Sequence, residues 1–311
     1  MSWPELIAMA RAAEAAGFDS LWMGDHLLFE LPGGVARGPW EVWTSLAALA
    51  AVTTTVELGP LVASTSFHPP AMLAKQAATV DAISGGRLIL GLGAGWNERE
   101  YRAFGFPFDH RVSRFEEAFT IIRGLLRDGR ADFDGSFHRV RDCVLDPPPA
   151  RPGGPPLMLG STSPRMMRIA LPHVDAWNVW WADYGNTVDG FAAVRDRVET
   201  AAAAAGRGPG EVAATAAVLV RLPGGSGRIM GGADHAGVRP IQGRPADLAG
   251  HLGAMAHAGA AHLQLVLDPI TQDAIEQLGE TLDLLDSWTA AEPGADLRPR
   301  SAAEPGAARR P

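Results

Sequence analysis

The chain has 311 residues, a single cysteine and a formal net charge of −8. This length suits one large domain or two small ones, and an acidic chain without a basic cluster argues against nucleic acid as the main partner. Because Cys143 has no second cysteine to pair with, an internal disulfide is excluded and a cysteine-based metal site is not expected. We expect no signal peptide and no membrane span, and therefore a cytoplasmic protein that acts on a small-molecule substrate.

Apolar residues alternate along the chain between the spacing of a helix and that of a strand. Helices are predicted over residues 3–16, 42–52, 69–83, 112–126, 164–171, 190–205, 245–258 and 272–288. Strands are predicted over residues 18–24, 56–63, 87–92, 157–159, 174–180, 212–222 and 262–267. A small hairpin is expected at 132–144 and a surface loop at 223–243. Strands that alternate with helices pair in parallel, so the pattern indicates an α/β protein.

The predicted strands number one fewer than a closed (β/α)8 barrel needs. The absent strand is the first, since the sequence opens on the helix that should follow it. Either the printed sequence begins too late or the barrel is open at one seam, and a doubly wound open sheet is the structural alternative. We favour a (β/α)8 TIM barrel over residues 1–289, because unusual residues follow strand after strand, where barrel enzymes build their sites. Residues 290–311 lack apolar periodicity and are predicted to be disordered.

Asp25 and His26, which follow the first predicted strand, are the best candidates for acid–base chemistry. An imidazole titrates near neutral pH and can donate or accept a proton, and a neighbouring carboxylate can orient it or contact a cofactor. The alternative is that the pair merely caps a turn. The position at a strand end favours a catalytic His26.

Two further strand ends carry residues suited to a ligand. Residues 93–95 read Gly-Ala-Gly and are followed by Trp96, so the backbone could approach a ligand closely, although this short motif alone is a weak signal. Residues 160–163 read Gly-Ser-Thr-Ser and open a helix with hydroxyls and unpaired N–H groups, which predicts an anion site. The same residues would serve equally well as a plain N-cap.

Tryptophans and histidines leave simpler interpretations open. Trp177, Trp180 and Trp181 could wall a substrate pocket or pack in the core, and period-two alternation places the first and third on one face and Trp180 on the other. The histidines at 235, 251, 257 and 262 match no zinc motif. We therefore expect no metal and interpret these histidines as surface residues.

Three segments resemble the luciferase-like monooxygenase family, and most of all its actinobacterial F420-dependent oxidoreductases: AGFDSLWMGDH at 16–26, HPPAMLAKQAATVDAISGGRLILGLGAGWNEREYRAFG at 68–105 and PPLMLGSTSPRMMRIALPHVDAWN at 155–178. The resemblance implies a (β/α)8 barrel in which His26 lies near the reactive carbon of a flavin-type ring and has an acid–base role. It also implies that the strand end at 63–64 supports the ring, often through a non-prolyl cis peptide. The implied cofactor-binding residues are Asp25, Ala63, Ser64, Gly93, Ala94, Gly95, Trp96, Gly160, Ser161 and Thr162.

Two features depart from the family. Its first strand, which contributes to the pocket floor, is absent here. The sugar-dehydrogenase branch carries a glutamate directly after the second glycine of the GxG motif, where this chain has Trp96, and Glu98 does not simply inherit that role. No substrate is assigned for this reason.

We expect an oxidoreductase that transfers a hydride between coenzyme F420 and a small organic substrate, with His26 handling the proton. The first alternative is an FMN-dependent monooxygenase that uses oxygen, and the second is a non-catalytic barrel that binds a flavin or nothing. The long acidic tail of F420 would favour cations near the phosphate site, such as Arg165 or Arg168. The alternative is that both are simply solvated residues of a helix. A homodimer formed through helices on one side of the barrel is compatible with the resemblance.

Overall fold

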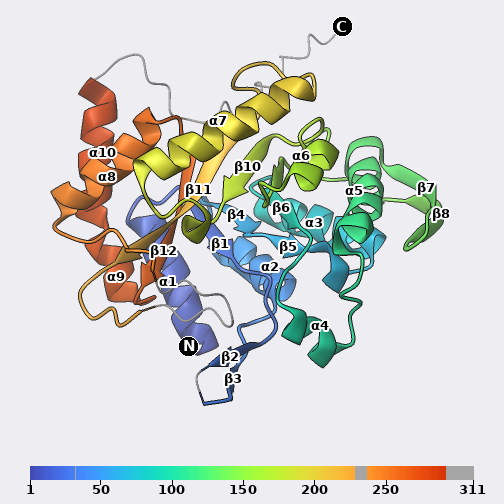
Figure 1. The fold of residues 1–311 in the computed structure, drawn as a ribbon. Helices are drawn as coiled ribbons and strands as arrows, with labels where there is room; N and C mark the ends of the chain where they lie inside the picture. The colour runs from blue at the N-terminus through green and yellow to red at the C-terminus, as the bar shows by residue number, and fades with distance from the viewer. Residues whose placement is uncertain (32, 228–236, 292–311) are drawn as a thin grey trace, which may run out of the picture.

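The computed structural model describes residues 1–31, 33–227 and 237–291, and Figure 1 shows how their elements are arranged. Part of the predicted loop 223–243 and nearly all of the predicted tail 290–311 lie outside these ranges. The helices are α1 (Trp3–Ala15), α2 (Val42–Val52), α3 (Pro70–Ser84), α4 (Glu98–Phe104), α5 (Arg111–Asp128), α6 (Pro164–Ala170), α7 (Val188–Ala204), α8 (Pro245–His257), α9 (Gln272–Gln277) and α10 (Gly279–Ala291). The strands are β1 (Ser20–Met23), β2 (Phe29–Leu31), β3 (Val35–Arg37), β4 (Glu57–Pro60), β5 (Ala63–Ser64), β6 (Leu90–Gly93), β7 (Arg130–Asp134), β8 (Arg139–Val144), β9 (Leu157–Leu159), β10 (Ala176–Val179), β11 (Ala213–Arg221) and β12 (His262–Asp268).

The central strands form a parallel barrel wall. Strands β12, β11, β10, β9, β6 and β5 pair in that order, and β1 pairs with β4. A bridge between Leu58 of β4 and Leu88, which leads into β6, joins the two sheets. Strands β4 and β5 are two halves of the predicted strand 56–63, which is interrupted at Leu61–Val62. Within the described ranges β1 and β12 do not pair, so the wall is open at that seam, as the count of predicted strands indicates.

The core lies between this wall and the helices around it (Figure 1). Leu90 and Leu157 on strands, and Leu46, Leu73 and Ile122 on helices, have essentially no exposed surface. Burying each such side chain contributes about 1.5–3 kcal/mol. No helix in the described part of the chain is long and apolar enough to cross a membrane.

Most predicted elements are present, and the differences are one divided helix and a few short elements. The hairpin predicted at 132–144 is the antiparallel pair β7–β8. The helix predicted over 272–288 is two helices, α9 and α10, which meet at the buried Leu278. The sequence pattern did not predict α4 or the hairpin β2–β3, because elements of seven and three residues are too short to establish a period.

Candidate active site

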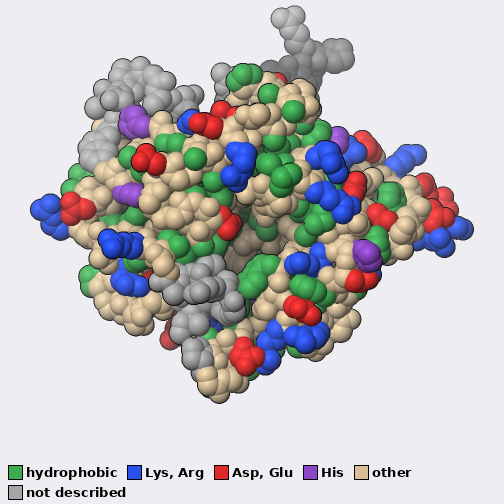
Figure 2. Space-filling view, in the orientation of Figure 1, with side chains coloured by type: hydrophobic (Ala, Val, Ile, Leu, Met, Phe, Trp, Pro, Cys, Tyr) green, Lys and Arg blue, Asp and Glu red, His purple; other side chains and the backbone are tan. Residues whose placement is uncertain are grey.

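A cavity of about 1810 Å³ begins at the carboxyl ends of the barrel strands and extends between β1 and β12 to side chains of α1, α8 and α10. Figure 2 shows a hollow near the centre of the face that it views. Ordinary small-molecule pockets measure roughly 300–1,000 Å³, so this cavity has room for a large cofactor together with a substrate. The predicted residues that line it are His26, Asp25, Ser64, Gly93, Ala94, Gly95, Trp96, Gly160, Ser161 and Thr162. Ala63 does not line the cavity, because it is fully buried, and Val62 lies on the wall instead.

A buried carboxylate fixes the ring of His26. The Nδ1 atom lies 3.0 Å from Oε2 of Glu100, whose side chain is 1% exposed. Oε1 of Glu100 also accepts the backbone N–H groups of Leu27 at 2.6 Å and Leu28 at 2.9 Å. Because a carboxylate only accepts hydrogen bonds, Nδ1 carries the proton and Nε2 is the ring nitrogen left for a ligand.

The environment of Glu100 keeps it ionised. Burial by itself would raise the pKa of this carboxyl group. The hydrogen bond and charge of His26, together with the N–H groups of Leu27 and Leu28, outweigh burial and hold the pKa below its ordinary value. Glu100 is therefore a buried negative charge beside the ring of His26.

Asp25 holds the neighbouring strand end in place. Its Oδ2 atom accepts the backbone N–H of Ser64 at 2.8 Å and lies 3.2 Å from Nε2 of His68. The Ser64 hydroxyl lies 2.9 Å from the hydroxyl of Tyr101, which donates to the Ala94 carbonyl at 2.9 Å. Asp25 thus links β1 to β5, and Tyr101 continues the network to the loop after β6.

The interruption between β4 and β5 lies two residues before the predicted position. The non-prolyl cis peptide is Leu61–Val62, whereas the resemblance implied one at 63–64. The Val62 side chain occupies the space beside Gly93 and Gly160, since an added Cβ at Gly160 would lie 2.4 Å from Val62 Cγ2. Glycine is therefore required at 160 by packing against Val62, a role that the sequence did not reveal.

The loop after β6 is shaped by Gly95. Its φ of +74° is in the left-handed region, and an added Cβ would lie 1.9 Å from the Tyr101 hydroxyl. Its carbonyl accepts a hydrogen bond of 2.7 Å from Arg111, which also lines the cavity. Trp96 is 45% exposed and packs edge-on against His26. The loop thus contributes an aromatic ring and bare backbone to the cavity wall, and Arg111 at the start of α5 contributes a cation.

The segment before α6 lies on the cavity wall, as the prediction of an anion site requires. The Ser161 hydroxyl accepts the backbone N–H of Ser163 at 3.2 Å, and the Ser163 side chain makes no capping bond to the helix. Nearby, Arg165 forms an ion pair with Glu116 at 3.1 Å. Anion binding by these residues stays a prediction.

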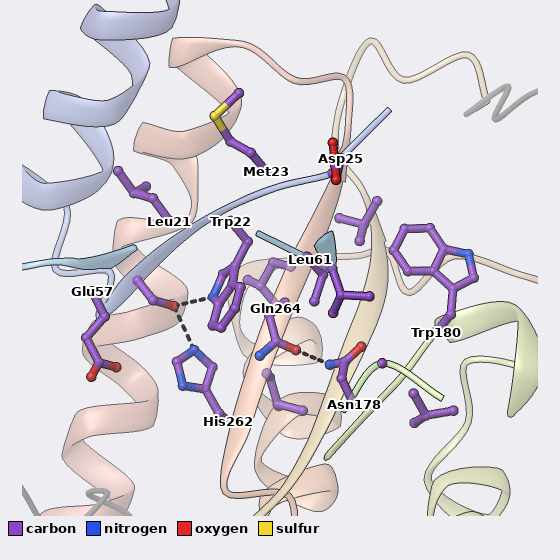
Figure 3. A pocket seen from close by; sticks show the side chains of 18 of the residues that line it. Leu21, Trp22, Met23, Asp25, Glu57, Leu61, Asn178, Trp180, His262 and Gln264 are labelled. Carbon is purple, nitrogen blue, oxygen red and sulfur yellow. Dashed lines mark hydrogen bonds between the residues drawn. The ribbon is translucent and has the colours of Figure 1, made fainter. Parts of the chain in front are cut away.

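Only one of the three neighbouring tryptophans lines the cavity. Trp177 and Trp181 are each 1% exposed and belong to the core, which is the simpler of the two interpretations. Trp180 lies on the cavity wall (Figure 3). Trp180 is the residue that period-two alternation placed on the opposite face from Trp177 and Trp181.

Deeper in the barrel a polar cluster crosses the seam between β1 and β12 (Figure 3). Nε2 of His262 lies 2.7 Å from the Ser20 hydroxyl, which accepts the indole N–H of Trp22 at 2.7 Å. Burial lowers the pKa of His262, so the expectation of a surface histidine was wrong. His235 lies outside the described residues, and no group of His, Cys, Asp and Glu within them could hold a metal ion.

Sequence reasoning missed three residues that organise the site: Glu100, Tyr101 and Arg111. The first two lie on α4, which the pattern did not predict. A signal was nevertheless present, since both lie in the segment 68–105 that carries the resemblance.

Comparisons with known proteins agree with this architecture. The chain matches the profile of the family described as luciferase-like monooxygenase over residues 1–222. It is 34% identical over 175 residues to the pyrimidine monooxygenase RutA of Cronobacter sakazakii, a match that covers 55% of this chain and 50% of that protein. A solved F420-dependent secondary alcohol dehydrogenase with an F420–acetone adduct aligns with a TM-score of 0.76 at 18% identity, covering 90% of this chain and 94% of that one. A riboflavin lyase with modified FMN and riboflavin aligns with a TM-score of 0.77 at 18% identity, covering 95% and 87%.

At these identities the two solved structures establish the fold alone, and they confirm the predicted barrel class. The chain spans about half the length of the curated relative that it matches. The family profile, in contrast, covers well over half of the 311 residues. The chain belongs to the luciferase-like monooxygenase family.

Proposed function

We propose that the protein is an oxidoreductase that transfers a hydride between coenzyme F420 and a small organic substrate, and that His26 exchanges the accompanying proton. The observation that carries this proposal is the His26–Glu100 pair on the wall of a cavity of about 1810 Å³. Glu100 holds the Nδ1 proton, so Nε2 is available to accept or donate one. The buried carboxylate would balance the charge of the imidazolium during the proton transfer.

The residues around the cavity fit a planar cofactor with an anionic tail. Gly93 and Gly95 leave bare backbone on the wall, and Trp96 offers an exposed aromatic ring. The hydroxyl-bearing segment 161–163 and the guanidinium of Arg111 would hold the phosphate end. When bound, F420 would supply the hydride chemistry, while the protein binds, orients and excludes water.

Charge near the cavity favours F420 over FMN. Lys and Arg side chains gather on this face over α5 and α6 (Figure 2). Arg165 is paired with Glu116, whereas Arg168 is exposed and has no ion pair with any described residue. The acidic tail of F420 extends beyond the phosphate and would meet these cations, but FMN ends at the phosphate.

An FMN-dependent monooxygenase that uses oxygen is the second candidate. It is supported by the similarity to RutA, which is named as a monooxygenase, and by the fold shared with a riboflavin lyase that holds modified FMN. The same cavity residues would bind either ring system. The dimer that the resemblance allows also stays a prediction.

Fluorescence titration of the purified protein with F420, and separately with FMN, tests the proposal. We expect F420 to bind and FMN to bind at least tenfold more weakly (about 1.4 kcal/mol). The His26→Asn variant should bind F420 normally but fail to reduce or oxidise it with any substrate that the parent protein turns over. Preference for FMN would support the monooxygenase, and binding of neither would support the non-catalytic barrel.

A further inference from the structure

The ring of His26 is held by more contacts than its hydrogen bond to Glu100. Its Cδ2 edge lies beside Gly24, where an added Cβ would be 3.3 Å away. The ring of Trp96 meets it edge-on at a centroid distance of 5.6 Å, and the ring of Phe29 lies closer, at 4.6 Å and tilted by 43°. With Nδ1 on Glu100 and Cδ2 against Gly24, the Nε2 and Cε1 atoms form the edge of the ring that is left for the cavity.

Phe29 differs from the other neighbours of His26 because it does not line the cavity. It is 4% exposed, whereas Trp96, Gly24 and Glu100 all belong to the cavity wall. A ligand in the cavity would therefore meet Trp96 but not Phe29. Phe29 would act on the chemistry through the imidazole ring.

The hairpin β2–β3 fixes the ring of Phe29 in turn. Phe29 begins β2 and pairs with Arg37 on β3. The guanidinium carbon of Arg37 lies 5.2 Å from the centre of the Phe29 ring, a cation–π contact that favours one orientation of the ring. The side chains of Arg37, Phe29 and His26 thus form a row of contacts from β3 to the cavity.

The same hairpin lies beside α4, which carries Glu100 (Figure 1). The Nη1 atom of Arg99 on α4 lies 2.5 Å from Oε2 of Glu30 on β2. The Nδ2 atom of Asn97 donates to the Leu28 carbonyl at 3.1 Å, and Glu100 accepts the backbone N–H of Leu28 at 2.9 Å. The support at the ring face and the support at Nδ1 therefore belong to one connected unit.

A hydrogen bond at Nδ1 does not by itself fix the direction of Nε2. The torsion that rotates a histidine ring about its Cβ–Cγ bond is broad and roughly two-fold, so packing against the ring face has to narrow it. Catalytic groups generally have to be held within about 0.5 Å and roughly 10–20° of the productive geometry. Phe29 is suited to this task because it restrains the face of the ring from outside the cavity.

We propose that Phe29 is a positioning residue, which sets the tilt of the His26 imidazole so that Nε2 points into the cavity. The consequence for turnover rests on the proposed function, because it assumes that His26 exchanges a proton at Nε2. The placement of the ring does not rest on it, since the contacts that hold the ring are made within the chain itself. The competing explanation is that Phe29 only fills space under the hairpin, in which case any apolar side chain of similar volume would serve.

Nuclear magnetic relaxation of a ¹³C label at Cε1 of histidine measures how tightly the His26 ring is held, without any cofactor. The His26→Asn variant identifies the signal. We expect an order parameter near the value of about 0.85 that a rigid backbone shows in the parent protein, and below about 0.6 in Phe29→Leu and Phe29→Met. Both replacements keep apolar bulk but lose the flat ring, and methionine adapts to irregular spaces, so at least one should fold.

Phe191→Leu is the matched control for these variants. Phe191 is fully buried and stacks on Trp177 in the core, away from His26. Its replacement should lower the stability of the protein but leave the order parameter of His26 unchanged.

Turnover with F420 gives the second readout. We expect kcat of the Phe29 variants to fall by about tenfold to 10²-fold, since a small misplacement of a catalytic group has an effect of that size. The Kd for F420 should stay the same, because Phe29 does not line the cavity.

Three results would overturn the proposal. The first is an order parameter of His26 that is as high in both Phe29 variants as in the parent protein, and the second is an equal fall in Phe191→Leu. The third is a loss of F420 affinity that accounts for the whole loss of turnover. A parent protein that does not bind F420 would instead refute the proposed function, and the relaxation comparison would still decide the role of Phe29.

Discussion

The two ends of the cavity differ in how their polar groups are paired. At the rim, buried polar groups are satisfied: Asp25 accepts hydrogen bonds from two partners, and Glu100 from His26 and two backbone N–H groups. The other end of the cavity lies between β12 and β1, which do not pair with each other in the described part of the chain. This space is lined by Leu21 and Leu265 among other residues, and we name it the β12–β1 slot. A satisfied polar network is rigid, whereas an open edge is a source of instability. Changes at the rim should therefore alter chemistry, whereas changes around the slot should leave chemistry unchanged and alter stability by small amounts.

The largest effect expected from this difference between rim and slot is that of replacing His26 by alanine. Loss of a positioned acid–base group typically lowers turnover by about 10²–10⁴-fold, and we expect a loss in that range here. The midpoint of thermal unfolding should change little, since the ring lies partly exposed at the cavity. Steady-state kinetics and a thermal melt of His26→Ala measure both quantities. His257→Ala, at an exposed position on α8, is the matched control and should match the parent protein in both.

A pair of leucine substitutions compares the closed and the open parts of the barrel wall. Leu90 on β6 is fully buried, and Leu265 on β12 lines the slot. Leu90→Ala should lower the free energy of unfolding by about 2–5 kcal/mol, whereas Leu265→Ala should lower it by under about 1 kcal/mol, because its side chain already faces a cavity. Urea unfolding measures both. Equal losses would mean that the slot is as tightly packed as the core.

Glu100→Gln should weaken turnover without abolishing it. We expect a loss of about 10–100-fold, as is usual when a residue that orients a functional histidine is changed. Steady-state rates measure this loss. Glu98→Gln, on the same helix but exposed, is the control, and an equal loss in that variant would contradict the assignment.

Strand ends and long helices could be predicted from the sequence because their patterns repeat. The periodicity placed α2 and β9 at their observed bounds. Placing the candidate residues at strand ends was enough to bring all but one of them to a single cavity. Parallel strands of a barrel bring their carboxyl ends to the same rim, so this outcome follows from topology.

Features that depend on packing between distant segments could not be predicted. Glu100 joins the candidate site through contacts with residues 26–28, and no local pattern records a contact across more than seventy positions. His262 was expected at the surface, but its strand turns it inward against Ser20. The cis peptide at Leu61–Val62 leaves no mark in composition, so the resemblance located it only approximately.

The smallest predicted effect concerns Glu14, which ties α1 to the base of the barrel. Burial would raise the pKa of this carboxyl group, but hydrogen bonds from Thr54, Thr55 and Val56 outweigh it and lower the pKa from its ordinary value of 4.5 to about 2. A group with a lowered pKa stabilises the fold above its unfolded value, and that stability is lost as the pH falls through the folded value. The contribution should therefore disappear between pH 4.5 and about 2.

Glu14→Gln should consequently lower the free energy of unfolding by about 1 kcal/mol near neutral pH, since water screens this partly exposed carboxylate, and by almost nothing at about pH 2. Urea unfolding at several pH values gives the comparison, with the exposed Glu199→Gln on α7 as the control that should match the parent protein. The side chain of Glu14 lies at the slot end of the cavity, among Thr55 and Glu57, far along the barrel from His26. F420 binding at the rim should therefore be the same in the variant and the parent protein. If the variant lost affinity for F420 in proportion to its loss of stability, cofactor binding at the rim would depend on the slot. The two ends of the cavity would then not be independent.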